Sequence, residues 1–196
     1  FNIIQKFLKE GGFESEGQTF FSDIEEFPKA HYFVISKRNI KSYRYWSYPT
    51  GKSKKTTVKC FQDFEDLLED AVRIRLRSDV PIGLLLSGGV DSSIIASIVK
   101  DLLKNNNKLQ TFTYSSGDKF DETKYAKAVV KKLDFELNIR TQDNTAKYYI
   151  NRLENLVKKM GRGHSSPSIV SIDYLYQSAS EKNIKVLLDG QGADEL

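Results

Sequence analysis

The stretch "LLLSGGVDSSII", residues 84–95, decides the fold. An aliphatic run is followed by Ser-Gly-Gly, then by an Asp and two serines, and then by further aliphatic residues. A short continuous apolar run, here residues 82–86, is typical of a strand buried on both faces of a sheet. Glycines mark a turn after it, and residues 92–104 have a helical pattern. The stretch therefore predicts a buried strand, a tight turn and a helix.

The sequence on either side continues this alternation. Apolar periodicity changes repeatedly between a helical pattern and short extended runs. We expect further strands at residues 109–114, 135–140 and 184–190, and helices at residues 58–77, 121–133, 144–160 and 169–182. Asp121 is the expected N-cap of its helix. Alternating strands and helices favour an α/β fold with a parallel sheet and helices on its faces.

The N-terminal part has a different character. Residues 19–48 are rich in aromatics and short alternations, which predicts two or three antiparallel strands. Residues 49–57 are rich in Gly, Lys, Ser and Thr and indicate a linker. The two regions therefore differ in character, and the length suits one domain or one domain plus part of another.

The turn after the first buried strand has the chemistry of an anion site. Gly88 and Gly89 let a ligand approach the main chain, and the following helix offers free N–H groups and a positive dipole end. The motif is not the common P-loop, which needs a lysine; Asp91 stands there instead. An acidic residue beside phosphates fits a role in holding Mg²⁺. The alternative is a purely structural turn with Asp91 as a helix cap.

Several segments resemble one family. "SGGVDSS" (87–93) resembles the PP-loop of ATP pyrophosphatases, which split ATP between its α and β phosphates. "RLRSDVPIGLLLSGGVDSSIIASI" (75–98), "FDETKYAKAVVKKL" (120–133) and "KVLLDGQGADEL" (185–196) resemble the synthetase domain of glutamine-dependent asparagine synthetases. Residues 17–48 resemble the end of that family's glutaminase domain. Alone, "GQGADE" is equally compatible with an acidic surface loop.

The resemblance implies an organisation and a site. Residues 1–56 are expected to be a C-terminal remnant of a glutaminase domain with a linker, and residues 57–196 part of a Rossmann-like, adenine-nucleotide α-hydrolase-like synthetase domain. It implies a pyrophosphate site at Ser87, Gly88, Gly89, Asp91, Ser92 and Ser93, and an adenosine site at Leu86, Thr113, Tyr114 and Gly190. It also implies Mg²⁺ ligands at Asp91 and Asp194, and catalytic roles for Asp91, Gln191 and Asp194.

The chemistry implied by the resemblance is amidation of a carboxylate. ATP and Mg²⁺ would activate aspartate as an acyl-adenylate, and ammonia from glutamine would displace AMP to give asparagine. The sequence departs from the family pattern in the last loop, with Asp189 where Ser is frequent and Gln191 where Glu is frequent. Gln191 can hydrogen-bond a substrate but cannot act as a carboxylate base. A relative acting on a different carboxylate, as β-lactam synthetases do, therefore remains an alternative.

Composition narrows the class of protein. The net charge is +4, without a large basic block or a cysteine pair, which argues against a nucleic-acid partner, including tRNA. No apolar run is long enough for a membrane span, and the single Cys60, expected to pack inside, suits the cytoplasm. The chain lacks an initiator Met and a cysteine near its start, so we expect a fragment. A homodimer and a nucleotide-binding remnant without turnover also remain open.

Overall fold

The computed structural model describes residues 2–10, 17–51, 56–103, 109–117, 119, 121–141, 145–166 and 168–193. The chain divides into two compact units, one formed by Phe1–Lys55 with Glu154–Pro167 and the other by Thr56–Leu153 with Ser168–Leu196. The second unit holds the predicted α/β elements.

The first unit contains an antiparallel hairpin. Strands β1 (His31–Ser36) and β2 (Asn39–Arg44) pair from His31 opposite Arg44 to Ser36 opposite Asn39. Helix α1 (Asn2–Glu10) and the end of α5 (Ala146–Met160) belong to the same unit. The prediction of two or three antiparallel strands is confirmed for two, because residues 18 and 25 form only an isolated bridge.

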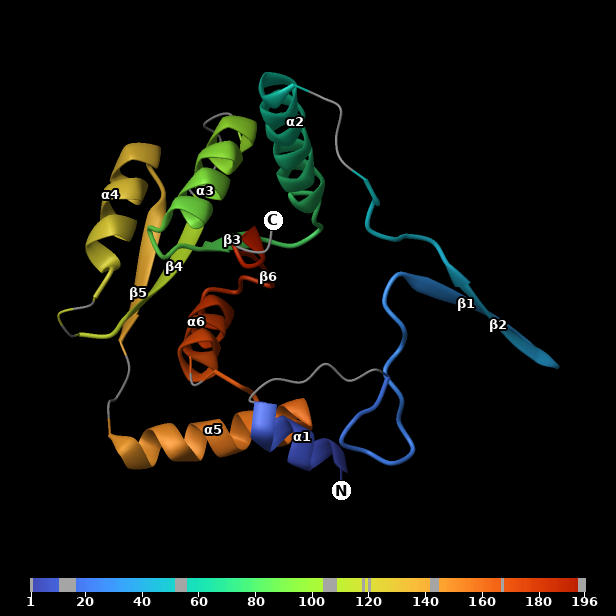
Figure 1. Ribbon diagram of the computed structural model, residues 1–196. Coiled ribbons are helices and arrows are strands. Elements are labelled where there is room, and N and C mark those ends of the chain that lie inside the picture. The colour runs from blue at the N-terminus through green and yellow to red at the C-terminus, as the bar shows by residue number, and fades with distance from the viewer. Residues whose placement is uncertain are drawn as a thin grey trace. The chain divides into compact units, whose positions relative to one another are not determined.

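The second unit is built on a four-stranded parallel sheet in the order β5-β4-β3-β6 (Figure 1). Its strands are β3 (Ile82–Leu85), β4 (Gln110–Ser115), β5 (Glu136–Thr141) and β6 (Val186–Leu188). Its other elements are α2 (Thr57–Arg75), α3 (Val90–Leu103), α4 (Thr123–Leu133), α6 (Ile169–Glu181) and the first half of α5. The predicted parallel α/β fold is confirmed, with the shortest strand forming one edge.

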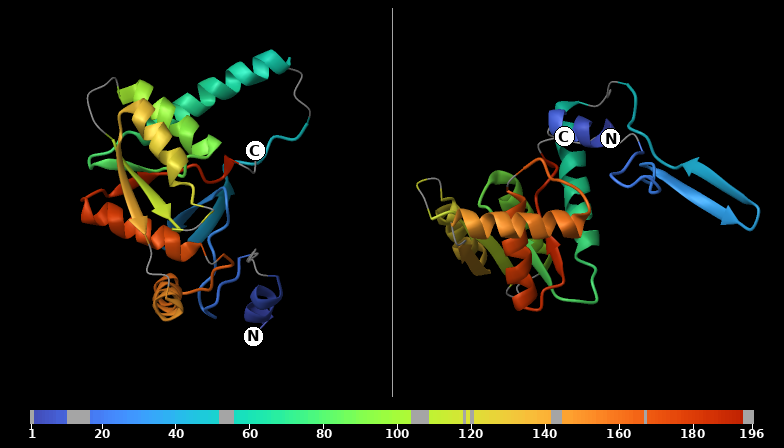
Figure 2. Two further views of the ribbon diagram at one scale, coloured as in Figure 1. Left: turned by 90° about the vertical axis from the view of Figure 1, so that its left-hand side faces the viewer. Right: turned by 90° about the horizontal axis from the view of Figure 1, so that it is seen from below.

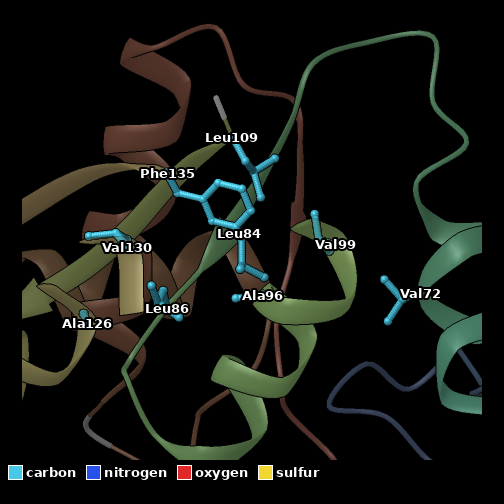
Figure 3. Packing of buried hydrophobic residues seen from close by; sticks show 9 residues of the cluster. All are labelled: Val72, Leu84, Leu86, Ala96, Val99, Leu109, Ala126, Val130 and Phe135. Carbon is cyan, nitrogen blue, oxygen red and sulfur yellow. The ribbon is translucent and has the colours of Figure 1, made fainter. Parts of the chain in front are cut away.

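Side chains of the central strand alternate between two hydrophobic layers, as the period of a strand requires. Leu84 and Leu86 are buried against α3 and α4, whereas Leu85 packs with Phe112 on the opposite face. Figure 3 shows the first layer, in which Phe135 lies close to Leu84. In Figures 1 and 2, α3 and α4 therefore cover one face of the sheet and α6 covers the other.

Helix α2 buries less of its surface than its sequence predicts. Val72 is 5% exposed and belongs to the core, but Val58 and Phe61 in the first turns are 68% and 66% exposed. The expectation that Cys60 packs inside is wrong, since its side chain is exposed. The end of α2 reaches the core, where Val72 belongs to the buried cluster and Leu76, the C-cap of the helix, packs against it.

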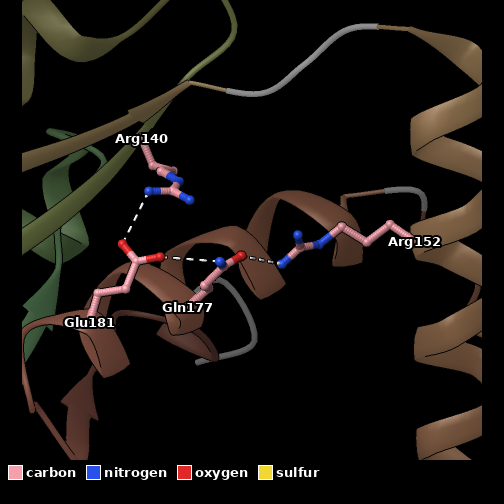
Figure 4. Close-up of polar contacts among 4 residues, drawn as sticks. All are labelled: Arg140, Arg152, Gln177 and Glu181. Atoms are coloured by element: carbon pink, nitrogen blue, oxygen red, sulfur yellow. Dashed lines mark hydrogen bonds and ion pairs between the residues drawn. The ribbon is translucent and has the colours of Figure 1, made fainter.

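A polar network runs along α6 (Figure 4). Arg140 of β5 pairs with Glu181, which accepts a hydrogen bond from Gln177 one turn earlier. Gln177 in turn accepts one from Arg152 of α5 at 3.0 Å. The network ties the first half of α5 and strand β5 to the same helix.

Among the described residues, no helix combines the length and the apolar character that a membrane crossing requires.

Candidate functional site

A cleft of about 650 Å³ lies at the carboxyl ends of β3, β4 and β6, within the size range of small-molecule sites. β3 lies between β4 and β6, so the chain turns to opposite sides of β3, and ligands bind at such switch points in open α/β sheets. The lining residues come from strands β3 and β4, from the segments that follow β3, β4 and β6, and from helices α3 and α6: Leu85, Leu86, Ser87, Gly89, Asp91, Ser92, Phe112, Thr113, Tyr114, Glu122, Leu175, Asp189, Gly190, Gln191 and Gly192.

The turn between β3 and α3 forms one wall of the cleft. The Ser87 and Ser92 hydroxyl oxygens lie 3.1 Å apart, and the Gly89 N–H donates to the Ser87 hydroxyl at 3.2 Å. The Ser92 hydroxyl also donates to the Gly89 carbonyl at 3.3 Å. The two hydroxyls are therefore held beside the start of α3, where free N–H groups and the helix dipole favour an anion.

Two residues expected to hold pyrophosphate are not among those lining the cleft. Gly88 has a φ of 84°, and a Cβ there would lie 2.5 Å from the backbone nitrogen of Ala126. The Ser93 hydroxyl donates to the Gly89 carbonyl at 2.6 Å, one turn back in its own helix. Gly88 thus lets the turn pack against α4, and Ser93 stabilises the turn through its hydrogen bond to Gly89.

The loop after β6 forms an adjoining wall. A Cβ on Gly190 would lie 3.1 Å from the Ser92 nitrogen and 3.3 Å from the Asp91 Cβ, so this glycine touches the start of α3. The Asp189 carboxylate accepts a hydrogen bond from the Gln191 N–H at 3.2 Å and shapes the turn. The predicted ligand Asp194 lies outside the described residues.

Strand β4 supplies the third wall, where the predicted residues Thr113 and Tyr114 are joined by Phe112. Phe112 and Thr113 are buried, and the carbonyl of Phe112 accepts a hydrogen bond from the Leu86 N–H at 2.9 Å. This bond carries the pairing of β3 and β4 one residue beyond β3. The structure therefore brings Leu86, Thr113, Tyr114 and Gly190 to one cleft, as the adenosine prediction requires.

Asp121 fastens the segment between β4 and α4 at the same end of the sheet. Its carboxylate accepts hydrogen bonds from the Ser115 hydroxyl, from the Gly117 N–H at 3.1 Å and from the Thr123 N–H at 2.8 Å. Donation by Ser115, followed by Thr123 and Gly117, holds the pKa of Asp121 well below its usual range. Helix α4 begins at Thr123, two residues later than predicted, but the Asp121 carboxylate still caps its first N–H.

The charges in the cleft are acidic. Asp91, Glu122 and Asp189 line it, and no Lys, Arg or His is among its described lining residues. Nor do any three or more His, Cys, Asp or Glu side chains within the described ranges form a group ready to hold a metal ion. Mg²⁺ usually takes one or two carboxylates and completes its shell with water and substrate phosphates, so Asp91 fits this role.

Sequence reasoning missed some lining residues. Glu122 directly follows Asp121 in the quoted segment after the second strand, so its position was a usable signal. Leu175 comes from α6, and which side of a helix faces a cleft depends on tertiary packing.

Comparisons with known proteins give matches that include the segments lining the cleft. The family description "Asparagine synthase" matches residues 63–196. A putative glutamine-hydrolysing asparagine synthetase from Methanocaldococcus jannaschii is 35% identical over 84% of this chain and 31% of its own length. The amidase chyE of Penicillium rubens is 27% identical over 96% of this chain and 30% of its own length. The chain thus spans about a third of the length of these curated relatives.

A solved structure shares the fold. The U34-tRNA thiolase NcsA from Methanococcus maripaludis, with its [4Fe-4S] cluster, superposes with a TM-score of 0.51 and 18% identity, over 68% of this chain and 48% of that one. At this identity the likeness concerns the fold alone. It agrees with the parallel α/β sheet of the second unit.

Proposed function

The chain belongs to the asparagine synthase family, and from that premise we propose that the full-length protein is a carbon–nitrogen ligase that uses ATP to convert a carboxylate into an amide. One observation carries the proposal. The Ser87–Ser93 turn and the Asp189–Gly192 loop, about a hundred residues apart in sequence, lie against each other and contribute to the lining of one cleft. Each carries a motif by which the sequence resembles this family.

ATP is the proposed nucleotide. Its adenosine would lie against Leu86, Thr113, Tyr114 and Gly190, and its pyrophosphate against the turn with Ser87, Gly89, Asp91 and Ser92. Gly88 and Ser93 would not contact the nucleotide. Gly88 would let the turn pack against α4, and the Ser93 hydroxyl would hold the Gly89 carbonyl. The start of α3 and the two lining hydroxyls suit phosphate oxygens, and the apolar strand ends suit a purine ring.

Asp91 and Asp194 are the proposed ligands of Mg²⁺. The acidic lining supports this proposal, since three carboxylates without a lining cation would otherwise repel a polyphosphate. Bound there, Mg²⁺ would neutralise charge on the phosphates and on the departing pyrophosphate. Asp91 would orient the metal from the first turn of α3, and Gln191 would hydrogen-bond the acceptor substrate.

The proposed reaction has two steps. A carboxylate oxygen of the acceptor attacks the α-phosphorus of ATP, and the bond to the β-phosphate oxygen breaks to release pyrophosphate. Ammonia, supplied by glutamine hydrolysis, then attacks the acyl carbon, and AMP leaves with the electron pair of the broken C–O bond. Positioning and charge neutralisation account for most such catalysis. A cleft made of backbone amides, hydroxyls and carboxylates suits those two effects.

Aspartate is the first acceptor that we propose, with asparagine as the product. A different carboxylate is the second candidate, because Gln191 stands where the family pattern often has Glu. The match to a protein named amidase chyE, along 96% of this chain, also favours testing it. Since the two candidates share ATP activation, they differ only in which carboxylate makes pyrophosphate release possible.

We further propose that residues 1–56 are the end of a glutaminase domain with its linker, and residues 57–196 part of the synthetase domain. The compact unit that begins at Thr56 supports the boundary. The exposed thiol Cys60 suits the reducing cytoplasm, the location proposed for the protein.

The test uses the full-length protein with Mg-ATP, glutamine or ammonia, and either aspartate or a panel of other carboxylates. We expect AMP and pyrophosphate in equal amounts, dependent on aspartate and accompanied by asparagine. Release only with another carboxylate would support the second candidate, and nucleotide binding without AMP would contradict the proposed chemistry. Asp91→Asn should lower the rate at least about 100-fold. Asp101→Asn, on the exposed end of the same helix, is the matched control.

A further inference from the structure

We infer that Asp121 is a positioning residue that sets the β4 side of the cleft by joining the end of β4 to the start of α4. The inference rests on the proposed function, because it concerns the same nucleotide cleft. Asp121 itself does not line the cleft. Tyr114 and Glu122 do line it, and they are the chain neighbours of Ser115 and Thr123, which hydrogen-bond to Asp121.

The carboxylate uses its two oxygens for two different parts of the chain. Oδ2 accepts from the Ser115 hydroxyl and from the Gly117 N–H at 3.1 Å, both at the end of β4. Oδ1 accepts from the Thr123 N–H at 2.8 Å, at the first residue of α4. One side chain therefore connects the strand end with the helix start.

The residues joined in this way flank the cleft wall. Tyr114 immediately precedes Ser115, and Glu122 lies between Asp121 and Thr123. A movement of Ser115 or Thr123 would displace the neighbouring lining side chain, because peptide geometry couples adjacent residues. The Glu122 carbonyl also accepts from the Tyr125 N–H at 2.9 Å, which ties Glu122 to the same helical turn.

A simple helix cap would not require this arrangement. Capping needs only the bond to Thr123, and its loss would weaken α4 alone. The two bonds from Ser115 and Gly117 instead hold the end of β4 and the residues just after it, which precede the segment that leads to α4. A positioning role therefore predicts an effect on the nucleotide that an effect on helix stability does not explain.

The experiment compares Asp121→Asn with Asp134→Asn in the full-length protein. Asn cannot accept at both of its terminal atoms, so Asp121→Asn breaks one side of the connection. Asp134 ends the same helix with a φ of 54°, a conformation that Asn tolerates well, so its variant controls for a lost charge on α4. The readouts are KM for Mg-ATP, kcat for pyrophosphate release and amide exchange at Gly117 and Thr123.

We expect Asp121→Asn to raise KM for Mg-ATP about tenfold and to speed amide exchange at one or both sites, with Asp134→Asn unchanged. Ser115→Ala combined with Asp121→Asn should be no worse than Asp121→Asn alone within about twofold, because both act through one contact. An unchanged KM in Asp121→Asn, an equal rise in Asp134→Asn, or fully additive effects would each overturn the inference.

The proposed function can fail separately. If the wild-type protein binds Mg-ATP but releases no pyrophosphate, the proposed chemistry fails, and the same tenfold change is then expected in the Kd for Mg-ATP. If the wild-type protein does not bind Mg-ATP at all, both the function and this inference are overturned. An active wild-type protein whose KM is insensitive to Asp121→Asn removes only the inference.

Discussion

A Cβ on Gly190 would lie 3.1 Å from the backbone nitrogen of Ser92, although the two residues are almost a hundred positions apart. The loop after β6 and the first turn of α3 are therefore in van der Waals contact where they line the cleft. No larger side chain fits at Gly190 unless one wall moves. The close approach of these two segments therefore requires glycine at position 190.

Gly190→Ala should weaken nucleotide binding more than it weakens the fold. The added methyl group must displace the start of α3 or the loop by a few tenths of an ångström, and overpacking of this kind typically costs about 1–3 kcal/mol. We expect about a tenfold rise in the Kd for Mg-ATP, measured by calorimetry. Asp101→Asn, at the exposed far end of α3, is the control for a substitution outside this contact. Unchanged binding in Gly190→Ala would contradict the contact.

Gly88→Ala should destabilise the protein, whereas Gly89→Ala should not. Gly88 has a φ of 84° and its Cβ would lie 2.6 Å from the Tyr125 carbonyl carbon, so both backbone strain and a clash with α4 oppose the substitution. We expect a loss of about 2 kcal/mol or more in the free energy of unfolding, measured by urea titration. The nearest atom to a Cβ on Gly89 is the Ser87 hydroxyl oxygen at 3.3 Å. Equal losses in the two variants would contradict the packing of the turn on α4.

Arg152→Met should lower the free energy of unfolding more than Arg140→Met. The Arg152 and Asp173 side chains are only 17% and 24% exposed, and Arg152 Nε donates to Asp173 Oδ2 at 2.6 Å. Loss of a charged hydrogen bond at such a site typically costs about 2 kcal/mol. The Arg140–Glu181 pair is 34% and 49% exposed, and exposed pairs contribute at most about 1 kcal/mol. Urea unfolding of both variants tests the order, and the reverse order would contradict it.

The stability contributed by Asp121 should depend on pH in the acid range. Hydrogen bonds from Ser115, Thr123 and Gly117 hold its pKa well below the usual value, so the ionised form stabilises the fold. That stabilisation is complete above the pKa of an unfolded Asp, about 3.9, and is lost as pH falls through the lower folded value. The difference in urea midpoint between wild type and Asp121→Asn should therefore be constant from about pH 5 to 8 and shrink below about pH 4.

Other carboxylates titrate in the same range, but they are present in both proteins and cancel in this difference. Asp134→Asn again serves as the control for the loss of a carboxylate beside α4. A difference for Asp121→Asn that stays constant down to pH 2 would contradict the lowered pKa.

Local pattern was enough for the secondary structure of the α/β part. The continuous apolar run before Ser87 indicates a central strand, and β3 is paired on both sides. The start of α4 and the exposure of Cys60 were predicted less well. The first depends on three hydrogen bonds to Asp121, and the second on how far along α2 the core extends. Periodicity records which residues are apolar, but it carries no information about which neighbour covers them.

By itself, the sequence determined the order of strands and helices, the glycine turn after β3 and the family, because these depend on local spacing and on residue identity. Only the tertiary structure decided which motif residues meet. It placed β6 beside β3, which brings Gly190 against Ser92, and it turned Gly88 and Ser93 away from the cleft lining. It also placed Glu122 and Leu175, which the sequence did not single out, in the lining of the cleft. The physical reason is that strand order and helix rotation follow from packing the whole sheet, to which every element contributes and which no single segment encodes.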